Sequence, residues 1–242
     1  MMKVKKIHPW NVTLDQAKDI QLALQPKIVL QPLLASPHWI AGADVAYSRE
    51  GGCCFAAVTV FAFPAMTVVE QQTAMANINF PYVPGYLTFR EAPALILAFE
   101  KISQVPDLII FDGQGIAHPR GLGIASHLGL LLDRPAIGCA KSVLVGNYEL
   151  PLPTAGHWTK LMFQGRGIGA VVRTRNHVKP LYISPGFKIT LEEAIHWVLT
   201  TCRGFRLPEP IRKSHATVNQ MRVNYDRSNH KITCSPDGPG LS

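Results

Sequence analysis

The sequence has little charge and few cysteines, and both shortages narrow the class of protein. Of its 242 residues, 17% are charged and 47% are hydrophobic, a balance typical of a globular protein rather than a disordered one. The five cysteines form an odd number without the spacing of a metal site. Three of them lie in apolar patterns, where a free cysteine behaves as a small hydrophobic residue. We therefore expect a reducing compartment.

The chain also lacks a long uninterrupted apolar run, a secretory signal pattern and internal repeats. The longest apolar stretch, residues 53–69, is broken by two threonines and a proline, so it predicts strands rather than a membrane span. The lysines near the amino terminus are not followed by an apolar segment. We expect a cytoplasmic protein that does not enter a membrane. A single domain is predicted over residues 1–221, followed by a disordered polar tail over 222–242.

Positively charged residues are in excess. Lys and Arg outnumber Asp and Glu by 24 to 16, which gives a formal net charge of +8 and a pI near 9.4. A polyanion is therefore a more natural partner than a cation. A basic protein without an anionic partner remains the alternative at this point.

Apolar periodicity predicts an α/β fold. Three segments joined by short turns indicate an antiparallel meander, with strands at residues 39–47, 53–62 and 66–73. A buried strand at 108–111, a helix at 121–132 and a strand at 135–140 form a right-handed unit with parallel strands. Together these segments indicate a mixed sheet of the ribonuclease-H-like type, flanked by helices, in which the first and fourth strands are neighbours.

The boundaries of the helices follow from capping and proline. Capping boxes at Thr13 and Thr190 predict two helix starts. Thr88 and Glu91 have the same spacing, but Pro93 would then lie beyond the first turn of the helix, where its missing N–H is costly. We therefore expect that helix to begin nearer Ala92, which leaves Glu91 at its amino end without a capping role. A strand at 165–173 and a last helical segment at 211–219 complete the prediction.

Two aspartates lie on strands that are predicted to be neighbours. Asp112 follows the buried strand 108–111 and precedes Gly113, and ligand sites of α/β sheets collect at that edge. Asp44 lies in the middle of the first strand, where a carboxylate needs a partner. A simple turn at Asp112 and a structural hydrogen bond at Asp44 are the alternatives. Side by side, the two carboxylates favour a hard cation such as Mg²⁺, with Mn²⁺ as a substitute.

Two further segments carry candidate functional residues. Lys141 stands where the strand 135–140 ends, at the same sheet edge as Asp112; it could contact a phosphate or be an ordinary surface lysine. Pro81 and Pro84 stiffen a loop that presents Tyr82, as an aromatic wedge between stacked bases would require. In the alternative interpretation, Tyr82 packs against the core.

Four ordered motifs resemble the endonuclease V family of deoxyinosine endonucleases. The motifs are Gly42 to Tyr47, Pro81 to Glu91, Asp112 to Arg120 and Leu207 to His215. The resemblance covers the chain up to about Asn219. It implies Mg²⁺-dependent hydrolysis of the second phosphodiester bond on the 3′ side of deoxyinosine in DNA, leaving a 3′-hydroxyl and a 5′-phosphate.

The resemblance also implies roles for individual residues. Asp44 and Asp112 would bind the metal ion with Glu91, while Lys141 and His215 would assist at the phosphate and its water. The residues of the wedge would be Pro81, Tyr82, Val83 and Pro84. Those of the pocket for the flipped base would be Gly85, Leu87, Gly113 and Ile124. We further expect His118 and Arg120 to contact a phosphate.

The partner of such an enzyme would be DNA that contains deoxyinosine or another lesion, and we expect a monomer. Two other functions stay open. An inosine-specific endoribonuclease could use the same site, because the sequence does not reveal how the groove treats a 2′-hydroxyl. A non-catalytic nucleic-acid-binding module is the third possibility. It has no use for three carboxylates near a polyanion, so Asp44, Glu91 and Asp112 argue against it.

Overall fold

The computed structural model describes residues 1–233, and its central element is a mixed sheet of eight strands. The strands are β1 (Trp39–Tyr47), β2 (Cys53–Ala62), β3 (Thr67–Asn77), β4 (Leu108–Phe111), β5 (Ala136–Ala140), β6 (Trp158–Phe163), β7 (Arg166–Val172) and β8 (Leu181–Phe187). The helices are α1 (Leu14–Leu24), the short 3₁₀ helix η1 (Gln25–Lys27), α2 (Leu87–Glu100), α3 (Ile124–Leu132), α4 (Leu191–Thr201) and α5 (Glu209–Thr233). Within the described residues, no helix combines the length and the apolar character needed to cross a membrane.

The order of the strands is β3-β2-β1-β4-β5-β8-β7-β6. The predicted meander is confirmed, because β1 pairs with β2, and β2 with β3, in antiparallel fashion. The predicted parallel unit is confirmed as well, since β4 runs parallel to both β1 and β5. The pairing of Ala43 with Phe111 places Asp44 and Asp112 one step further along two adjacent strands.

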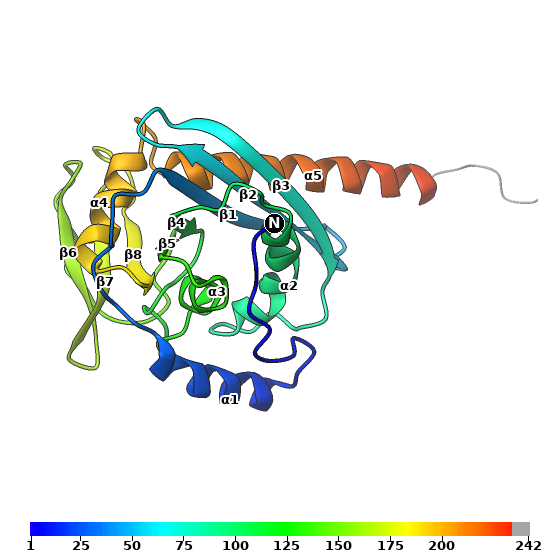
Figure 1. Ribbon diagram of the computed structural model, residues 1–242, viewed down its shortest axis with the longest axis horizontal. Helices are drawn as coiled ribbons and strands as arrows, with labels where there is room; N and C mark the ends of the chain where they lie inside the picture. Colours follow the sequence, from blue (N-terminus) through cyan, green and yellow to red (C-terminus); the bar gives the residue numbers. More distant parts are fainter. Residues whose placement is uncertain (234–242) are drawn as a thin grey trace, which may run out of the picture.

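Helices cover both faces of the sheet. Alternate residues of a strand point to opposite faces: Ala41 and Ala43 of β1 join the core beneath α2 and α3, whereas Ile40 joins the core beneath α4 and α5. Figure 1 shows α5 along one side of the sheet and α2 and α3 on the other. Side chains from both layers therefore reach the edge where β1 and β4 end.

Helix α2 begins earlier than expected. It starts at Leu87 and includes Pro93, so the prediction of a start near Ala92 is wrong, and Glu91 lies inside the helix rather than at its amino end. The packing of Phe89 explains the difference. Its ring is buried and lies 5.5 Å from the ring of Phe80, measured between centroids. Burial of an aromatic side chain contributes about 2 to 3 kcal/mol, which offsets much of the cost of a proline within a helix.

Helix α5 corrects the prediction of a disordered tail. It continues through Thr233, so residues 222–233 are helical. Tyr225 packs edge-on against Phe55 of β2, with 5.2 Å between the ring centroids, and Asp226 accepts a hydrogen bond from the backbone N–H of Arg49. These contacts with the β1–β2 hairpin stabilise a segment that lacks apolar periodicity. The rest of the predicted tail, residues 234–242, lies outside the described residues.

Strands β6 and β8 extend the sheet beyond the predicted strands. The strand predicted at 165–173 is β7, and it pairs with both of them in antiparallel fashion. Pro185 and Gly186 lie inside β8, which hides this strand in the sequence because neither residue is a strand former. Pro185 is tolerated because the register between β8 and β5 shifts at that point.

Candidate active site

The candidate active site lies at the carboxyl ends of β1 and β4. Asp44 comes from β1 and Asp112 directly follows β4, where its backbone N–H donates a 3.2 Å hydrogen bond to the carbonyl oxygen of Ala43. One side-chain ligand atom of each aspartate and one of His215 lie within 4.8 Å of one another. Strand order and register thus bring the two predicted aspartates together, and α5 adds the histidine.

His215 reaches the site because α5 lies close to β1. A Cβ atom on Gly42 would come within 2.1 Å of the backbone of Pro210, so only glycine permits this approach. Ser214 Oγ secures the contact by donating a 2.9 Å hydrogen bond to the carbonyl of Gly42. The imidazole Nδ1 of His215 is 2.6 Å from Asp44 Oδ2. This hydrogen bond raises the pKa of His215, against the opposing effect of partial burial, so the cationic form is favoured beside Asp44.

Lys141 and Asp112 form an ion pair across the ends of β5 and β4. The sequence-based expectation that the two residues share one sheet edge is therefore confirmed. Burial and the nearby charge of Asp44 raise the pKa of Asp112, and the ammonium group of Lys141 opposes the rise. The two aspartates therefore repel each other, and Lys141 offsets part of this repulsion.

Glu91 approaches from the opposite helical layer. Its carboxylate is buried on α2, and Oε1 accepts a 2.5 Å hydrogen bond from the hydroxyl of Tyr47 at the end of β1. Burial raises the pKa of Glu91 to about 8; the charges of Asp44 and Asp112 add to the rise, and the Tyr47 hydrogen bond opposes it. Glu91 lies outside the tight group of three ligands, yet it shares their electrostatic field.

The donor set fits a divalent cation. Two carboxylates and an imidazole converge, and a third carboxylate lies near them. Carboxylate oxygens suit Mg²⁺ and Mn²⁺, and His215, whose cationic form is favoured by Asp44, lies beside these oxygen ligands. A cation here would relieve the repulsion that raises the pKa values of Asp112 and Glu91.

The loop before α2 exposes its aromatic side chain. Tyr82 is 71% exposed, so the alternative in which it packs against the core is excluded. The base of the loop is anchored, because Arg90 Nη1 donates a 2.7 Å hydrogen bond to the carbonyl of Phe80. The backbone N–H of Tyr86 also donates to the carbonyl of Val83, which closes a turn around Pro84. A stiff loop with an exposed aromatic side chain is what a wedge requires.

The residues of the predicted base pocket come from two loops. Gly85 and Leu87 lie where the wedge loop joins α2, while Gly113 and Ile124 come from the segment between β4 and α3. Gly113 and Ile124 touch, since a Cβ atom on Gly113 would lie 2.6 Å from Ile124 Cγ2. Gly85 has a backbone φ of +82°, a conformation that favours glycine.

His118 and Arg120, the residues predicted to contact a phosphate, both bond to the loop before α2. The His118 ring is buried, and its Nε2 donates to the carbonyl of Gly85 across 2.8 Å. Arg120 donates to the same carbonyl across 2.7 Å, and its guanidinium lies over the ring of Tyr86. Both side chains are engaged within the protein, so this geometry does not support the predicted phosphate contacts.

Sequence reasoning missed two residues that support the site. Tyr47 carries a weak signal, because it ends the motif that contains Asp44. Gln21 carries a clearer one. It shares the buried face of α1 with Ala17 and Leu24, and a polar residue at a core position of a helix needs hydrogen-bond partners.

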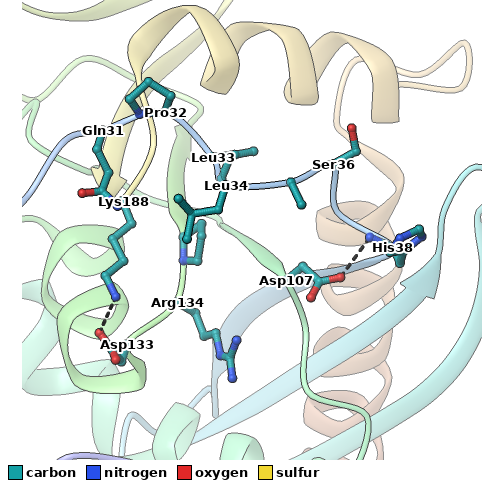
Figure 2. A pocket seen from close by; sticks show the side chains of 12 residues that line it. Gln31, Pro32, Leu33, Leu34, Ser36, His38, Asp107, Asp133, Arg134 and Lys188 are labelled. Atoms are coloured by element: carbon teal, nitrogen blue, oxygen red, sulfur yellow. Dashed lines mark hydrogen bonds and ion pairs between the residues drawn. The ribbon is translucent and has the colours of Figure 1, made fainter.

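A separate pocket of about 290 Å³ lies at the opposite edge of the sheet, where β1, β4 and β5 begin. Its carboxylates are already paired, as Figure 2 shows. Asp133 bonds to Lys188, and Asp107 accepts hydrogen bonds from the backbone N–H groups of His38 and Trp39. Among the described residues, Asp44, Asp112 and His215 converge as possible metal ligands, whereas Asp107 and Asp133 of this pocket belong to no such group.

Comparisons with known proteins agree with this placement. The model of the family described as Endonuclease V matches residues 22–216. The Endonuclease V of Dehalococcoides mccartyi strain BAV1 is 48% identical over 220 residues, which are 91% of this chain and 99% of the relative. The crystal structure of the Bacillus subtilis Endonuclease V is 31% identical with a TM-score of 0.89, covering 94% of this chain and 100% of the other.

A third similar protein was crystallised with nucleic acid. It is the Ciona intestinalis Endonuclease V in complex with a 24mer DNA containing an inosine followed by a ribo-adenosine. It is 25% identical to this chain with a TM-score of 0.75, covering 88% of this chain and 98% of the other. The likeness thus extends to a structure that holds a nucleic acid.

Proposed function

This chain belongs to the Endonuclease V family, and from that premise we propose that it nicks DNA beside deoxyinosine, at the second phosphodiester bond on the 3′ side. The convergence of Asp44, Asp112 and His215 within 4.8 Å carries the proposal. Family members are nucleases, which hydrolyse phosphodiester bonds. The DNA bound to the Ciona relative contains inosine, which supports this choice of lesion.

Asp44 and Asp112 would hold the cation, and Glu91 would complete the acidic set from the other side. When bound there, such a cation would lower the pKa of the attacking water and would neutralise charge on the phosphate. Tyr47 fixes the position of the Glu91 carboxylate by its hydrogen bond.

Lys141 and His215 would act on the phosphate itself. Lys141 is half-exposed beside Asp112, so its ammonium group can contact a phosphate oxygen while it remains paired. The Nδ1 atom of His215 is held by Asp44, which leaves Nε2 as the atom that exchanges protons. Hydrolysis to a 3′-hydroxyl and a 5′-phosphate breaks the bond between phosphorus and O3′. The imidazolium form of His215 can protonate that leaving oxygen.

Recognition would precede cleavage. Tyr82 would enter the base stack at the lesion, and the displaced hypoxanthine would occupy the pocket between Gly85 and Gly113. Mispaired bases cost less to displace from the stack than paired ones. Hypoxanthine lacks the exocyclic amines of adenine and guanine, and a narrow pocket excludes those amines sterically.

The test uses end-labelled duplexes that are identical except for one position, with deoxyinosine or deoxyadenosine there. Each is incubated with Mg²⁺ or with a chelator. A nick one nucleotide past deoxyinosine that requires Mg²⁺ is the expected result, with the deoxyadenosine duplex intact. Equal cutting of both duplexes, or cutting in chelator, would contradict the proposal.

A second candidate is an inosine-specific endoribonuclease with the same site. The nucleic acid of the Ciona complex has a ribo-adenosine after the inosine, which supports this second candidate. A single-stranded RNA with one inosine, cut in parallel with the DNA, distinguishes the two. Cutting of the RNA alone would move the function to RNA metabolism.

A further inference from the structure

One backbone carbonyl near the predicted base pocket receives three hydrogen-bond donors. The oxygen of Gly85 lies 3.0 Å from Gln21 Nε2, 2.8 Å from His118 Nε2 and 2.7 Å from Arg120 Nη2. A carbonyl oxygen has two lone pairs, so three donors saturate it. These hydrogen bonds to the Gly85 oxygen therefore hold the loop before α2 in place.

Two of the three side chains continue to the opposite loop. Gln21 Nε2 also lies 3.5 Å from the carbonyl of Leu122, and the backbone N–H of Leu122 donates to His118 Nδ1 across 3.4 Å. These two contacts to Leu122 are longer than the hydrogen bonds to Gly85. Gln21 and His118 each connect Gly85 with Leu122 across the space between the two loops.

The hydrogen bonds of His118 fix its tautomer. Its Nδ1 accepts from the backbone N–H of Arg120 at 3.1 Å as well as from Leu122, so the proton must reside on Nε2, which faces Gly85. The ring is neutral in this arrangement. Burial and the charge of Arg120 lower its pKa to about 4, although the bond to Gly85 opposes the change.

Gln21 uses its amide group completely. The side chain is fully buried, its Nε2 serves Gly85 and Leu122, and its Oε1 accepts from Arg120 Nε at 2.5 Å. It comes from α1, far from the metal ligands in sequence, and the family model begins one residue after it.

The two loops that Gln21 connects carry the two walls of the pocket. Gly85 belongs to one wall, and Leu122 precedes by two residues Ile124, which touches Gly113 in the other. We propose that Gln21 is a positioning residue that sets the width of the base pocket and so determines specificity for the flipped base. The inference rests on the proposed function, because it assumes that a base enters between these walls.

Loss of the Gln21 amide would leave His118 to connect Gly85 with Leu122, and Arg120, which also bonds to Gly85, would lose its acceptor on Gln21. The walls would then sample wider separations, and a base that fits a narrow slot would lose contacts. A duplex with an abasic site presents no base to this pocket. Its binding depends on backbone contacts and on the wedge, whose base is anchored separately by Arg90. The two duplexes therefore report separately on pocket width and on general binding.

The experiment measures binding in chelator by fluorescence anisotropy, with duplexes that carry deoxyinosine, a tetrahydrofuran abasic site or deoxyadenosine at one position. The variant is Gln21→Met, which keeps the length of the side chain but removes both the donors and the acceptor. Lys18→Met is the matched control, because residue 18 is exposed on the same helix. Thermal melts establish that both variants are folded.

We expect Gln21→Met to bind the deoxyinosine duplex about 10-fold more weakly, which corresponds to about 1.4 kcal/mol, and the abasic duplex within 2-fold of wild type. Equal losses on both duplexes, or no loss on either, would overturn the proposal. If Gln21→Met does not fold, Gln21→Glu takes its place. This variant also removes the Nε2 donors, and it keeps an acceptor for Arg120. If wild type itself fails to prefer deoxyinosine over deoxyadenosine, the proposed function fails instead, whatever the variants do.

Discussion

The hydroxyl of Tyr47 donates a 2.5 Å hydrogen bond to the buried carboxylate of Glu91, across the boundary between β1 and α2. The guanidinium of Arg90 lies over the same tyrosine ring, 4.9 Å from its centroid, and also bonds to the carbonyl of Phe80 beneath the wedge loop. Tyr47 thus supports Glu91, and Arg90, which lies over the Tyr47 ring, supports the wedge loop.

Removal of the Tyr47 hydroxyl should weaken metal binding. In Tyr47→Phe, Glu91 loses the hydrogen bond that favours its charged form, so more Mg²⁺ is needed to ionise and engage it. We expect the Mg²⁺ concentration for half-maximal nicking to rise several-fold, with near-normal rates at saturating Mg²⁺. Tyr225→Phe serves as the control, since Tyr225 packs on Phe55 away from the acidic residues. An unchanged Mg²⁺ dependence would remove Tyr47 from the support of Glu91.

Asp112→Asn should separate cleavage from binding. The change keeps the size of the side chain and removes the charge that pairs with Lys141 and would hold the cation. Single-turnover nicking is expected to fall at least about 10³-fold, which is about 4 kcal/mol, while affinity for deoxyinosine DNA in chelator stays within a few-fold. A parallel loss of binding and of thermal stability would show that Asp112 maintains the fold instead.

Tyr82→Ala should impair recognition without disturbing the metal site. Tyr82 is exposed, so its removal leaves no cavity in the core, and the melting temperature should not change. Stacking of one base on an aromatic ring is worth about 1 to 3 kcal/mol, so lesion affinity should drop at least about 5-fold. Tyr82→Phe retains the ring and should retain the affinity. If the alanine variant binds as wild type does, Tyr82 is not the wedge.

Acid should destabilise the protein through His127. Burial, with smaller contributions from His8 and His118, lowers the pKa of His127 from 6.5 to about 3. Between these pH values the unfolded chain binds a proton that the folded protein does not, so stability is complete above pH 6.5 and falls as the pH falls. From pH 7 to pH 5, the free energy of unfolding of wild type should drop about 2 kcal/mol more than that of His127→Phe.

Urea denaturation at the two pH values provides that comparison. Phenylalanine does not titrate, and position 127 lies among the rings of Trp10 and Phe89, which accept an aromatic side chain. His157→Phe, at an exposed position, is the matched control and should follow wild type. Equal pH slopes in wild type and His127→Phe would mean that His127 is not the group that titrates.

The half of the sheet that contains the aspartates could be predicted from the sequence because its signals are local. Apolar runs mark β1, β2 and β4, and a carboxylate marks the end of β4. Three antiparallel strands followed by a parallel unit form the ribonuclease-H-like pattern, in which the strands that carry Asp44 and Asp112 are neighbours, as the strand order shows.

Features that depend on distant partners could not be predicted in this way. Pro93 is tolerated inside α2 because Phe89 packs against Phe80, and the helical extension after Arg222 depends on contacts with the β1–β2 hairpin. His118 lies in the same sequence motif as Asp112, yet its hydrogen-bond partner is Gly85, 33 residues earlier. Such pairings exist only once the chain is folded.

The contact between α5 and β1 also governs when the protein acquires its site. Asp44 and His215 are separated by 171 residues, and α5 can dock against Gly42 only after the chain has been synthesised beyond residue 215. A nascent chain still on the ribosome, surrounded by RNA, therefore contains the acidic residues without the histidine. A chain that ends before residue 215 would contain Asp44 and Asp112 without the hydrogen bond that His215 makes with Asp44.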